Sequence, residues 1–369
     1  MFFYIIYIII LLGFALNEIF NSDLNKKTQR NYIGLLCIIL LIIHDGFRWE
    51  TGTDWNGYYY TFLNSLSGSK VMMEPGYLLF NYAIRYITNN YTIFLIIHAT
   101  IIYTLIIRTI FQHSVAPFLS ILCLYCLMLP YLGMNRQYLA MAICIFSIRY
   151  IISRRSTYFI FCILIAMLFH ISAVMFFIAY FLTKKISLKY FLILIIIAFV
   201  ISFSNIINTL KFSNILMAGM VSTKSAFYIG VGKTTLLGSL LGTFNRLIWP
   251  IFVLLHMEKV KNKDAKFYLF LNISLISAIL YIIFNGTSYQ IIIARGLLYF
   301  NIFQIFLIPY IIYLFKNGLG RLSIFAILCI FYLSMTIKGI RSYQIEGKDD
   351  IFIPYKGIFI NTEFERRVY

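Results

Sequence analysis

Charged residues are scarce in this chain of 369 residues, since only 12% are Asp, Glu, Lys or Arg. Carboxylates are the rarest charged groups, with 13 Asp and Glu against 31 Lys and Arg. Soluble domains carry about 25% charged residues. This composition therefore excludes an ordinary soluble enzyme.

The cysteines do not indicate a functional site. The six cysteines all lie inside apolar segments, at Cys37, Cys123, Cys126, Cys144, Cys162 and Cys329. We interpret them as small core residues that predict neither a disulfide framework nor a metal site.

The net charge of +18 does not predict nucleic-acid binding, because the basic residues fall in short loops where they meet anionic lipid.

What the chain has in excess is apolar side chains, which make up 61% of it. A membrane span needs about 20 apolar residues. The apolar side chains form runs whose lengths we compare with this value, at 2–20, 31–46, 91–110, 115–134, 137–153, 157–183, 189–205, 241–257, 267–284, 291–315 and 322–337. We predict an all-α polytopic membrane protein with about 11–13 membrane segments, and we expect residues 1–369 to form a single integral membrane domain. The first run has no basic leader and no small-residue cleavage site, so we expect it to be a retained helix.

Basic residues predict the orientation of these helices. The clusters lie around Lys26 to Arg30, Arg154 and Arg155, Lys184 to Lys189, Lys259 to Lys266, and Lys316 to Arg321. If all of them are cytoplasmic, the N-terminus, the loops 45–90 and 205–240, and the tail 338–369 face outward.

Two segments do not fit simple spans. Residues 76–88 are short and amphipathic, and we predict an interfacial or re-entrant helix there. The run 157–183 has basic residues at both ends, which favours a half-height hairpin that turns near His170.

A phosphate-loop motif is only superficially present. Gly230 to Thr235 reads Gly-Val-Gly-Lys-Thr-Thr, but Phe227 occupies the position of the first motif glycine and no strand precedes it. We therefore exclude a nucleotide-binding loop.

Residues 45–62 interrupt the apolar sequence with polar and aromatic groups. They contain Asp45, Arg48, Glu50 and Asp54 together with Trp49, Trp55 and Tyr58 to Tyr60. Such groups can bond hydroxyl and phosphate oxygens and stack on sugar faces. The alternative is an ordinary loop with an interfacial aromatic belt.

Isolated polar residues near helix ends form a second set, namely Arg136 with Gln137, His170, Arg246 and Arg295. The predicted topology places all of them toward the outer side, where several arginines with few carboxylates suggest an anionic ligand such as a diphosphate. Each arginine alone could equally reach lipid headgroups, and a single histidine at a helix turn could be structural.

The motifs taken together resemble those of the EpsG-like, Wzy-type polymerases of bacterial surface polysaccharides. The matching pieces are Gly46 to Tyr58, Glu74 to Tyr77, Arg136-Gln137 with Leu139-Ala140, Phe169-His170 with Ser172-Ala173, Arg295 to Pro309, and Ile353 to Lys356. The resemblance implies a fold of the GT-C-like, O-antigen polymerase and ligase type. It also implies a glycosyltransferase of the bacterial inner membrane that uses no metal and no nucleotide sugar.

The expected substrate is an undecaprenyl-diphosphate-linked oligosaccharide, and a chain-length regulator protein is an expected partner beside membrane lipid. We assign stabilisation of the leaving diphosphate to Arg48, Arg136 and Arg295, with Arg246 as a further contact. The base that deprotonates the acceptor hydroxyl is left open among Asp54, Glu74 and His170. Further substrate contacts are expected from Trp55, Tyr58, Tyr59, Gln137 and Tyr355.

Other functions remain as alternatives. A lipid-linked glycan ligase would need the same chemistry, and a flippase would also use arginines on the outer face. A transporter, however, needs a polar path through both membrane halves and often has internal repeats, whereas the buried charges here cluster on one side.

Overall fold

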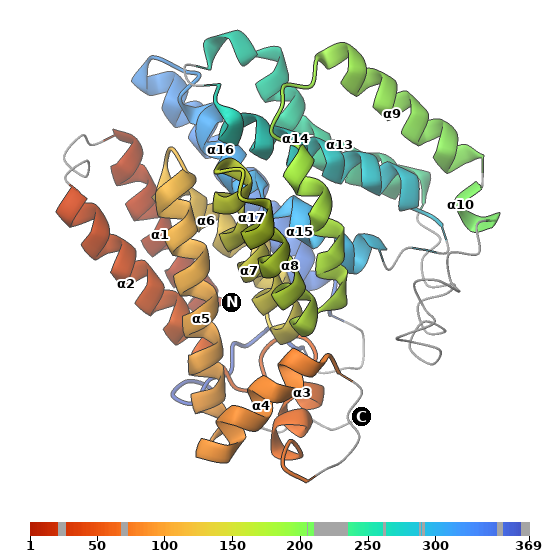
Figure 1. The fold of residues 1–369 in the computed structure, drawn as a ribbon. Helices are drawn as coiled ribbons and strands as arrows, with labels where there is room; N and C mark the ends of the chain where they lie inside the picture. The colour runs from red at the N-terminus through yellow and green to blue at the C-terminus, as the bar shows by residue number, and fades with distance from the viewer. Residues whose placement is uncertain are drawn as a thin grey trace.

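The computed structural model describes residues 1–20, 27–67, 73–204, 206–209, 235–260, 263–287, 289, 292–344 and 350–362. This part of the chain is helical and contains isolated β-bridges but no β-strand (Figure 1). The predicted all-α class is therefore confirmed. Most of the predicted loop 205–240, including nearly all of Gly230 to Thr235, lies outside the described residues.

The first half of the chain builds one side of the bundle. Its helices are α1 (Phe2–Phe20), α2 (Lys27–Gly46), α3 (Trp55–Leu63), α4 (Pro75–Ile87), α5 (Tyr91–His113), α6 (Pro117–Met128), η2 (Leu129–Tyr131) and α7 (Asn135–Ile152). Helix α2 packs on α5, α1 on α6, and α5 on α7. Most residues of α6 and of α7 are buried, so both helices lie in the interior of the bundle.

The second half begins with a hairpin and continues across the bundle. Its elements are α8 (Ser156–Phe169), η3 (Ile171–Phe181), α9 (Leu188–Phe203), α10 (Ile206–Thr209), α13 (Leu236–Leu255), η4 (Met257–Lys259), α14 (Ala265–Phe284), η5 (Ile292–Gly296), α15 (Leu298–Asn301), α16 (Gln304–Ile312) and α17 (Gly318–Arg341). Helices α13 and α14 pack together, and α9 packs on α14.

Five described helices are long and apolar enough to cross a membrane, namely α1, α5, α13, α14 and α17. The segments Ile292–Asn301 and Gln304–Ile312 pass the same test as a pair bent by 44°, which gives a sixth candidate span. Shorter apolar helices, such as α8 and α9, accompany them. The chain is thus a multi-pass membrane protein by length and composition, and the larger count of 11–13 segments stays a prediction.

The hairpin predicted within residues 157–183 is present. Helix α8 ends at Phe169, and His170 has an extended backbone that starts η3. Phe159, near the start of α8, packs against Tyr180, near the end of η3, with ring centroids 5.4 Å apart. Helix α8 has 14 residues, about 21 Å at 1.5 Å per residue, and the 3-10 helix η3 has 11 residues, about 22 Å at 2.0 Å per residue. Each arm is too short for a full span.

The segment predicted to be an interfacial helix forms α4, with Pro75 in its first turn. It lies beside α3 beyond the lower ends of the long helices in Figure 1, and it packs against α8. Gly76 makes that approach possible, because a Cβ there would lie 2.7 Å from Leu168 Cβ. The close contact brings the start of α4 next to the hairpin turn.

The C-terminal segment 350–362 crosses the same end of the molecule. The Tyr4 hydroxyl donates to the carbonyl of Phe352 at 2.7 Å, and the Tyr355 hydroxyl donates to that of His44 at 2.6 Å. The amide of Gly52 donates to the Ile351 carbonyl at 2.7 Å. This segment therefore joins α1, the end of α2 and the loop that follows it.

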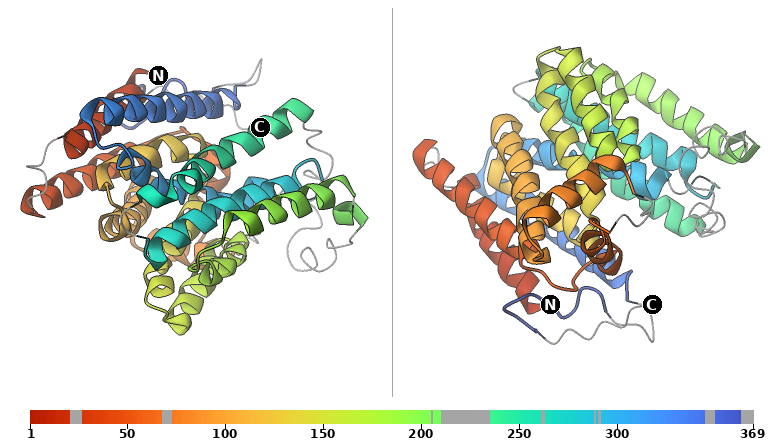
Figure 2. Two further views of the ribbon diagram at one scale, coloured as in Figure 1. Left: turned by 90° about the horizontal axis from the view of Figure 1, so that it is seen from above. Right: turned by 60° about the horizontal axis from the view of Figure 1, so that its bottom comes forward.

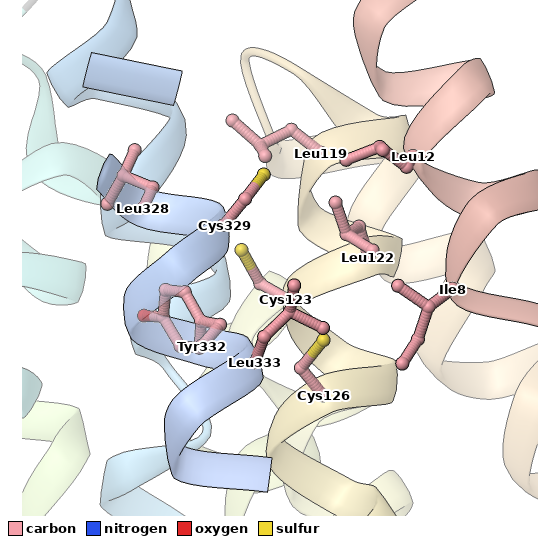
Figure 3. A pocket seen from close by; sticks show the side chains of 10 residues that line it. All are labelled: Ile8, Leu12, Leu119, Leu122, Cys123, Cys126, Leu328, Cys329, Tyr332 and Leu333. Atoms are coloured by element: carbon pink, nitrogen blue, oxygen red, sulfur yellow. The ribbon is translucent and has the colours of Figure 1, made fainter. Parts of the chain in front are cut away.

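A small apolar cavity lies between α1, α6 and α17, of which α1 and α17 lie at the same edge of the left view in Figure 2. Its walls include Ile8 and Leu12 from one helix and Cys123, Cys126 and Cys329 from the others (Figure 3). The lining carries no charged group, so this cavity is separate from the polar chemistry described below.

Two backbone segments cross at Gly52 and Gly133, whose φ angles are +100° and +102°. A Cβ on Gly133 would meet the backbone of Thr53, whose amide donates to the Leu132 carbonyl at 2.7 Å. The crossing fixes the loop after α2 against the start of α7, and it needs glycine for both the conformation and the space.

We predict that Gly133→Ala destabilises the protein by about 2 kcal/mol or more, because it adds both backbone strain and a clash. Thermal unfolding of the purified protein in detergent measures this effect. Gly13→Ala is the matched control, since a Cβ on Gly13 meets nothing within 4 Å. Equal melting temperatures for the two variants would contradict the prediction.

Candidate functional site

Arg136 lies at the start of α7, and its guanidinium bonds to two residues from earlier in the chain, Glu74 and Tyr58. Its Nη1 donates to the carboxylate of Glu74, and its Nε donates to the Tyr58 hydroxyl at 3.3 Å. The side chain of Arg136 is 20% exposed and that of Glu74 is 9% exposed. The guanidinium is therefore oriented by the protein but still open on one side.

Tyr58 is buried on α3, where its ring packs on Tyr77 at 5.4 Å. Burial raises the pKa of Tyr58 above its usual value, and this effect exceeds the opposing effect of Arg136. The phenol consequently stays neutral and serves as a hydrogen-bond acceptor for Arg136.

His170 lies at the turn between α8 and η3, next to Ser172. The Nδ1 atom of His170 is 2.6 Å from the Ser172 hydroxyl. Within the described part of the chain, no group hydrogen-bonds to its Nε2. One nitrogen of the ring is thus fixed, and the other is available for a substrate.

Arg295 belongs to η5, a π-helical turn that precedes α15. Its backbone carbonyl accepts a hydrogen bond from Gln137 Nε2, and its Nη1 lies 3.7 Å from the sulfur of Met134. Single π-turns are frequent at functional sites. Here the turn connects the Arg295 backbone to the start of α7, where Arg136 lies.

These side chains form one electrostatic cluster. Glu74, Arg136 and Arg295 all lie within electrostatic range of the His170 ring, and both arginines also act on Tyr58. With two guanidinium groups and one carboxylate, the cluster is positive and suits an anionic ligand such as a phosphate ester. Of the predicted site residues, the structure therefore brings together Tyr58, Glu74, Arg136, Gln137, His170 and Arg295.

Asp54 borders this cluster and directly precedes α3. It is exposed, has a positive φ of 54° that is unusual for a residue with a side chain, and makes no side-chain bond to cap the helix. Its charge acts on Tyr58. Its carboxylate is consequently open to solvent beside the arginine cluster.

Arg48 has a different environment, since it is only 1% exposed. Its Nε donates to Asp45 at 2.6 Å, its Nη1 to the Thr51 carbonyl at 3.0 Å, and its Nη2 to Asn135 Oδ1 at 2.7 Å. Burial favours a lower pKa for Arg48, but Asp45 raises the pKa above its usual value. The residue is therefore a buried cation whose donors face the protein, and a direct role at a substrate stays a prediction that this geometry does not favour.

Three predicted aromatic contacts pack within the protein. Trp55 is 3% exposed and contacts Tyr91, with ring centroids 5.2 Å apart. Tyr59 contacts the same ring at 5.2 Å, and Tyr355 stacks on Phe3 at 4.0 Å. Trp55 and Tyr355 therefore have no open ring face that would support their predicted contact with sugars.

Arg246 lies on α13, away from the contacts described above. Its guanidinium stacks over Tyr281 of α14 at 3.9 Å, and its Nη1 donates to the Gly242 carbonyl at 2.8 Å. The groups that act on its charge are Tyr281 and Tyr131, and neither belongs to the cluster around Arg136.

The structure adds three residues that sequence reasoning did not select as site residues. Asn135 accepts a hydrogen bond from Arg48 and precedes Arg136, while Ser172 contacts His170 and Tyr299. Asn135 and Ser172 stand within two residues of a selected residue in the sequence, which was the available signal. For Tyr299 the available signal was its place inside the matching segment Arg295 to Pro309, four residues after Arg295.

Comparison with known proteins gives one family match. The model of the EpsG family matches residues 31–356, which is most of the chain. No curated protein and no solved structure matches.

We predict that Arg48→Ala reduces the amount of folded protein, because it leaves Asp45 buried without its partner. Breaking a buried ion pair costs about 3–5 kcal/mol. The control is Lys266→Ala, since Lys266 lies 3.6 Å from Asp264 in a more exposed pair, where such a pair contributes about 1 kcal/mol or less. Thermal unfolding and protein yield provide the measurement. A normal yield and melting temperature for Arg48→Ala would contradict the buried structural role.

Proposed function

The chain belongs to the EpsG family, and from this premise we propose that it polymerises lipid-linked oligosaccharide repeats of a bacterial surface polysaccharide. The family points to a polysaccharide polymerase type of function. We propose further that the substrates are linked to undecaprenyl diphosphate and that the active site faces the outer side of the inner membrane. The product class covers O-antigen of lipopolysaccharide, capsule and exopolysaccharide.

The observation that carries this proposal is the meeting of three separate motifs around one positive cluster. Glu74 from the start of α4, Arg136 from the start of α7 and His170 from the hairpin turn interact electrostatically, and Arg295 joins them. Such a cluster provides cations for a diphosphate and an open imidazole nitrogen for a proton. These are the two requirements for transfer of a glycosyl group from a lipid diphosphate to a hydroxyl.

In the proposed reaction, a hydroxyl oxygen of the acceptor repeat attacks the anomeric carbon at the reducing end of the growing chain. The bond between that carbon and the diphosphate oxygen breaks, and the lipid diphosphate leaves with the bonding electron pair. Arg136 and Arg295 stabilise the negative charge that develops on the leaving group. His170 Nε2 accepts the proton of the hydroxyl, and Asp54 is the second candidate for this role.

Glu74 has a different role in this mechanism, because its carboxylate already accepts a hydrogen bond from Arg136. It orients the guanidinium and limits the positive charge of the empty site. Arg48 acts through Asn135, which directly precedes Arg136 in α7, and so we assign it a positioning role. The proposed chemistry uses neither a metal nor a nucleotide sugar, and a separate chain-length regulator remains a proposed partner.

We predict that Arg136→Ala abolishes long polymer while the protein remains folded, because it removes a cation that the transition state needs. Loss of such a group typically costs about 100-fold to 1,000-fold in rate. The measurement is the surface polysaccharide ladder of a deletion strain that carries the variant.

The matched control is Arg85→Ala on α4, whose guanidinium lies over the ring of Phe62. We expect this variant to keep the ladder. A full ladder for Arg136→Ala would contradict the proposed active site. If deletion of the gene removes even the single capped repeat, the chain acts before polymerisation, and a flippase would explain its role better.

A further inference from the structure

Arg246 is a cation that the mechanism proposed above does not use. It lies in the middle of α13, a helix that is long and apolar enough to cross a membrane. The sequence has no Asp or Glu between Glu74 and Glu258, and no ion pair in the described part of the chain includes Arg246. A charge kept in such a helix usually marks a ligand or a polar pathway.

The guanidinium of Arg246 is positioned by α14 but is not saturated with hydrogen bonds. It lies over the Tyr281 ring at 3.9 Å, and its Nη1 donates to the Gly242 carbonyl at 2.8 Å. Gly242 permits the close approach of α13 and α14, because a Cβ there would clash with the Tyr281 hydroxyl. The buried Nε of Arg246 has no hydrogen-bond partner among the residues that the structure describes. Donors of a partly exposed guanidinium therefore remain for a ligand.

Trp249 provides a second donor without a partner, one turn further along α13. The residue is 4% exposed and packs on Phe331 of α17 with ring centroids 5.2 Å apart, yet its Nε1 has no hydrogen-bond partner within the described ranges. A buried indole N–H usually has one. Residues three apart are neighbours on a helix surface, so Trp249 and Arg246 share one side of α13. A phosphate group has enough oxygens to accept from both.

The backbone of α13 is also interrupted at this turn. Pro250 has no N–H, so it cannot bond to the carbonyl of Arg246 four residues earlier. Interrupted backbone in a membrane helix is tolerated where protein shields it or where it lines a polar cavity. The interruption and the two unused donors therefore lie in the same part of α13.

Arg149 makes the same two kinds of contact at a different place in its helix. Its guanidinium lies over the Phe146 ring at 3.7 Å, and its Nε donates to the Phe146 carbonyl at 3.2 Å. It belongs to the last turn of α7, where the negative end of the helix dipole stabilises a cation. Arg246 lacks this stabilisation because it lies in the middle of α13.

Arg246 is separate from the cluster around Arg136 but near it in the fold. Its charge acts on Tyr131 of η2, and it is not among the groups that act on His170. Arg136 follows Tyr131 by five residues, so their Cα atoms are at most about 18 Å apart. The protein therefore has two cationic places joined by the short segment that leads into α7.

The reaction proposed above uses two lipid-linked molecules, each with its own diphosphate. Arg136 and Arg295 are assigned to the diphosphate that leaves, whereas the acceptor keeps its diphosphate throughout the step. We propose that Arg246 and the Nε1 of Trp249 bind the diphosphate of the acceptor lipid, in a second anion site separate from the cluster around Arg136. The assignment to the acceptor rests on the proposed function, whereas the second diphosphate site does not.

The first test counts the diphosphate lipids bound to the full-length protein in phosphatidylcholine nanodiscs by native mass spectrometry. The probe is undecaprenyl diphosphate, which carries no sugar and cannot be polymerised. We expect two bound molecules for the wild type and one each for Arg246→Gln and Arg136→Gln. Arg149→Gln is the matched control and should bind two. One molecule on the wild type, or two on Arg246→Gln, would overturn the proposal.

Trp249→Phe is a second variant, because it removes only the Nε1 donor and keeps an aromatic ring against Phe331. We expect one of the two molecules to bind about 10-fold more weakly, as for loss of one hydrogen bond to a charged group. Unchanged affinity for both molecules would contradict the site.

Excess phosphatidylglycerol distinguishes the acceptor lipid from bulk membrane lipid. We expect it to displace neither molecule of undecaprenyl diphosphate. Displacement of the molecule that depends on Arg246 would reveal a general headgroup site and overturn the assignment.

Kinetics separates binding from chemistry. In liposomes with a defined lipid-linked repeat, Arg246→Gln should need at least about 10-fold more repeat for its half-maximal rate and then approach the wild-type rate, because it loses a contact made equally before and during the reaction. Arg136→Ala should stay slow at every concentration. The same behaviour in Arg246→Gln would place Arg246 among the reacting groups and overturn its role at the acceptor.

The outcomes separate this inference from the proposed function. If the wild type binds two diphosphate lipids and Arg246→Gln binds one, but no polymer forms, the polymerase assignment fails and the second site stands. If the wild type polymerises but binds a single diphosphate lipid, the second site is overturned and the polymerase assignment stands.

Discussion

The buried guanidinium of Arg48 is the interaction on which the organisation of the site depends. A charge removed from water needs a counter-charge and full hydrogen bonding. Asp45 supplies the charge, and the Thr51 carbonyl and the Asn135 side chain supply further acceptors. Because these groups come from the end of α2, the following loop and the start of α7, the requirement of one side chain holds three segments together.

The same requirement reaches the polar cluster through Asn135. Its side chain binds Arg48, and its carbonyl contacts His98 Nε2 at 2.9 Å, so the first residue of α7 is held from two sides. Arg136 follows directly and points to Glu74 and Tyr58. A rigid support beneath a partly exposed arginine is what preorganised electrostatic stabilisation needs, since the cation must not reorient during the reaction.

The sequence was sufficient for the features that depend on length and periodicity. The short arms between two basic ends predicted the hairpin at His170, and the composition predicted the helical membrane class. The sequence did not predict contacts between side chains and partners that are far apart along the chain. Arg48 resembled a ligand-binding arginine because Asn135 lies 87 residues away. Tyr355 resembled a sugar contact because its hydrogen bond to the His44 carbonyl joins residues 311 positions apart.

The most direct test of this account is polymerisation by the purified protein alone. The protein would be reconstituted in liposomes with one chemically defined undecaprenyl-diphosphate-linked repeat, without nucleotide sugars and without added metal. The account predicts products containing two or more repeats together with stoichiometric release of undecaprenyl diphosphate. Consumption of the repeat without longer products, or extension only when a nucleotide sugar is supplied, would contradict it.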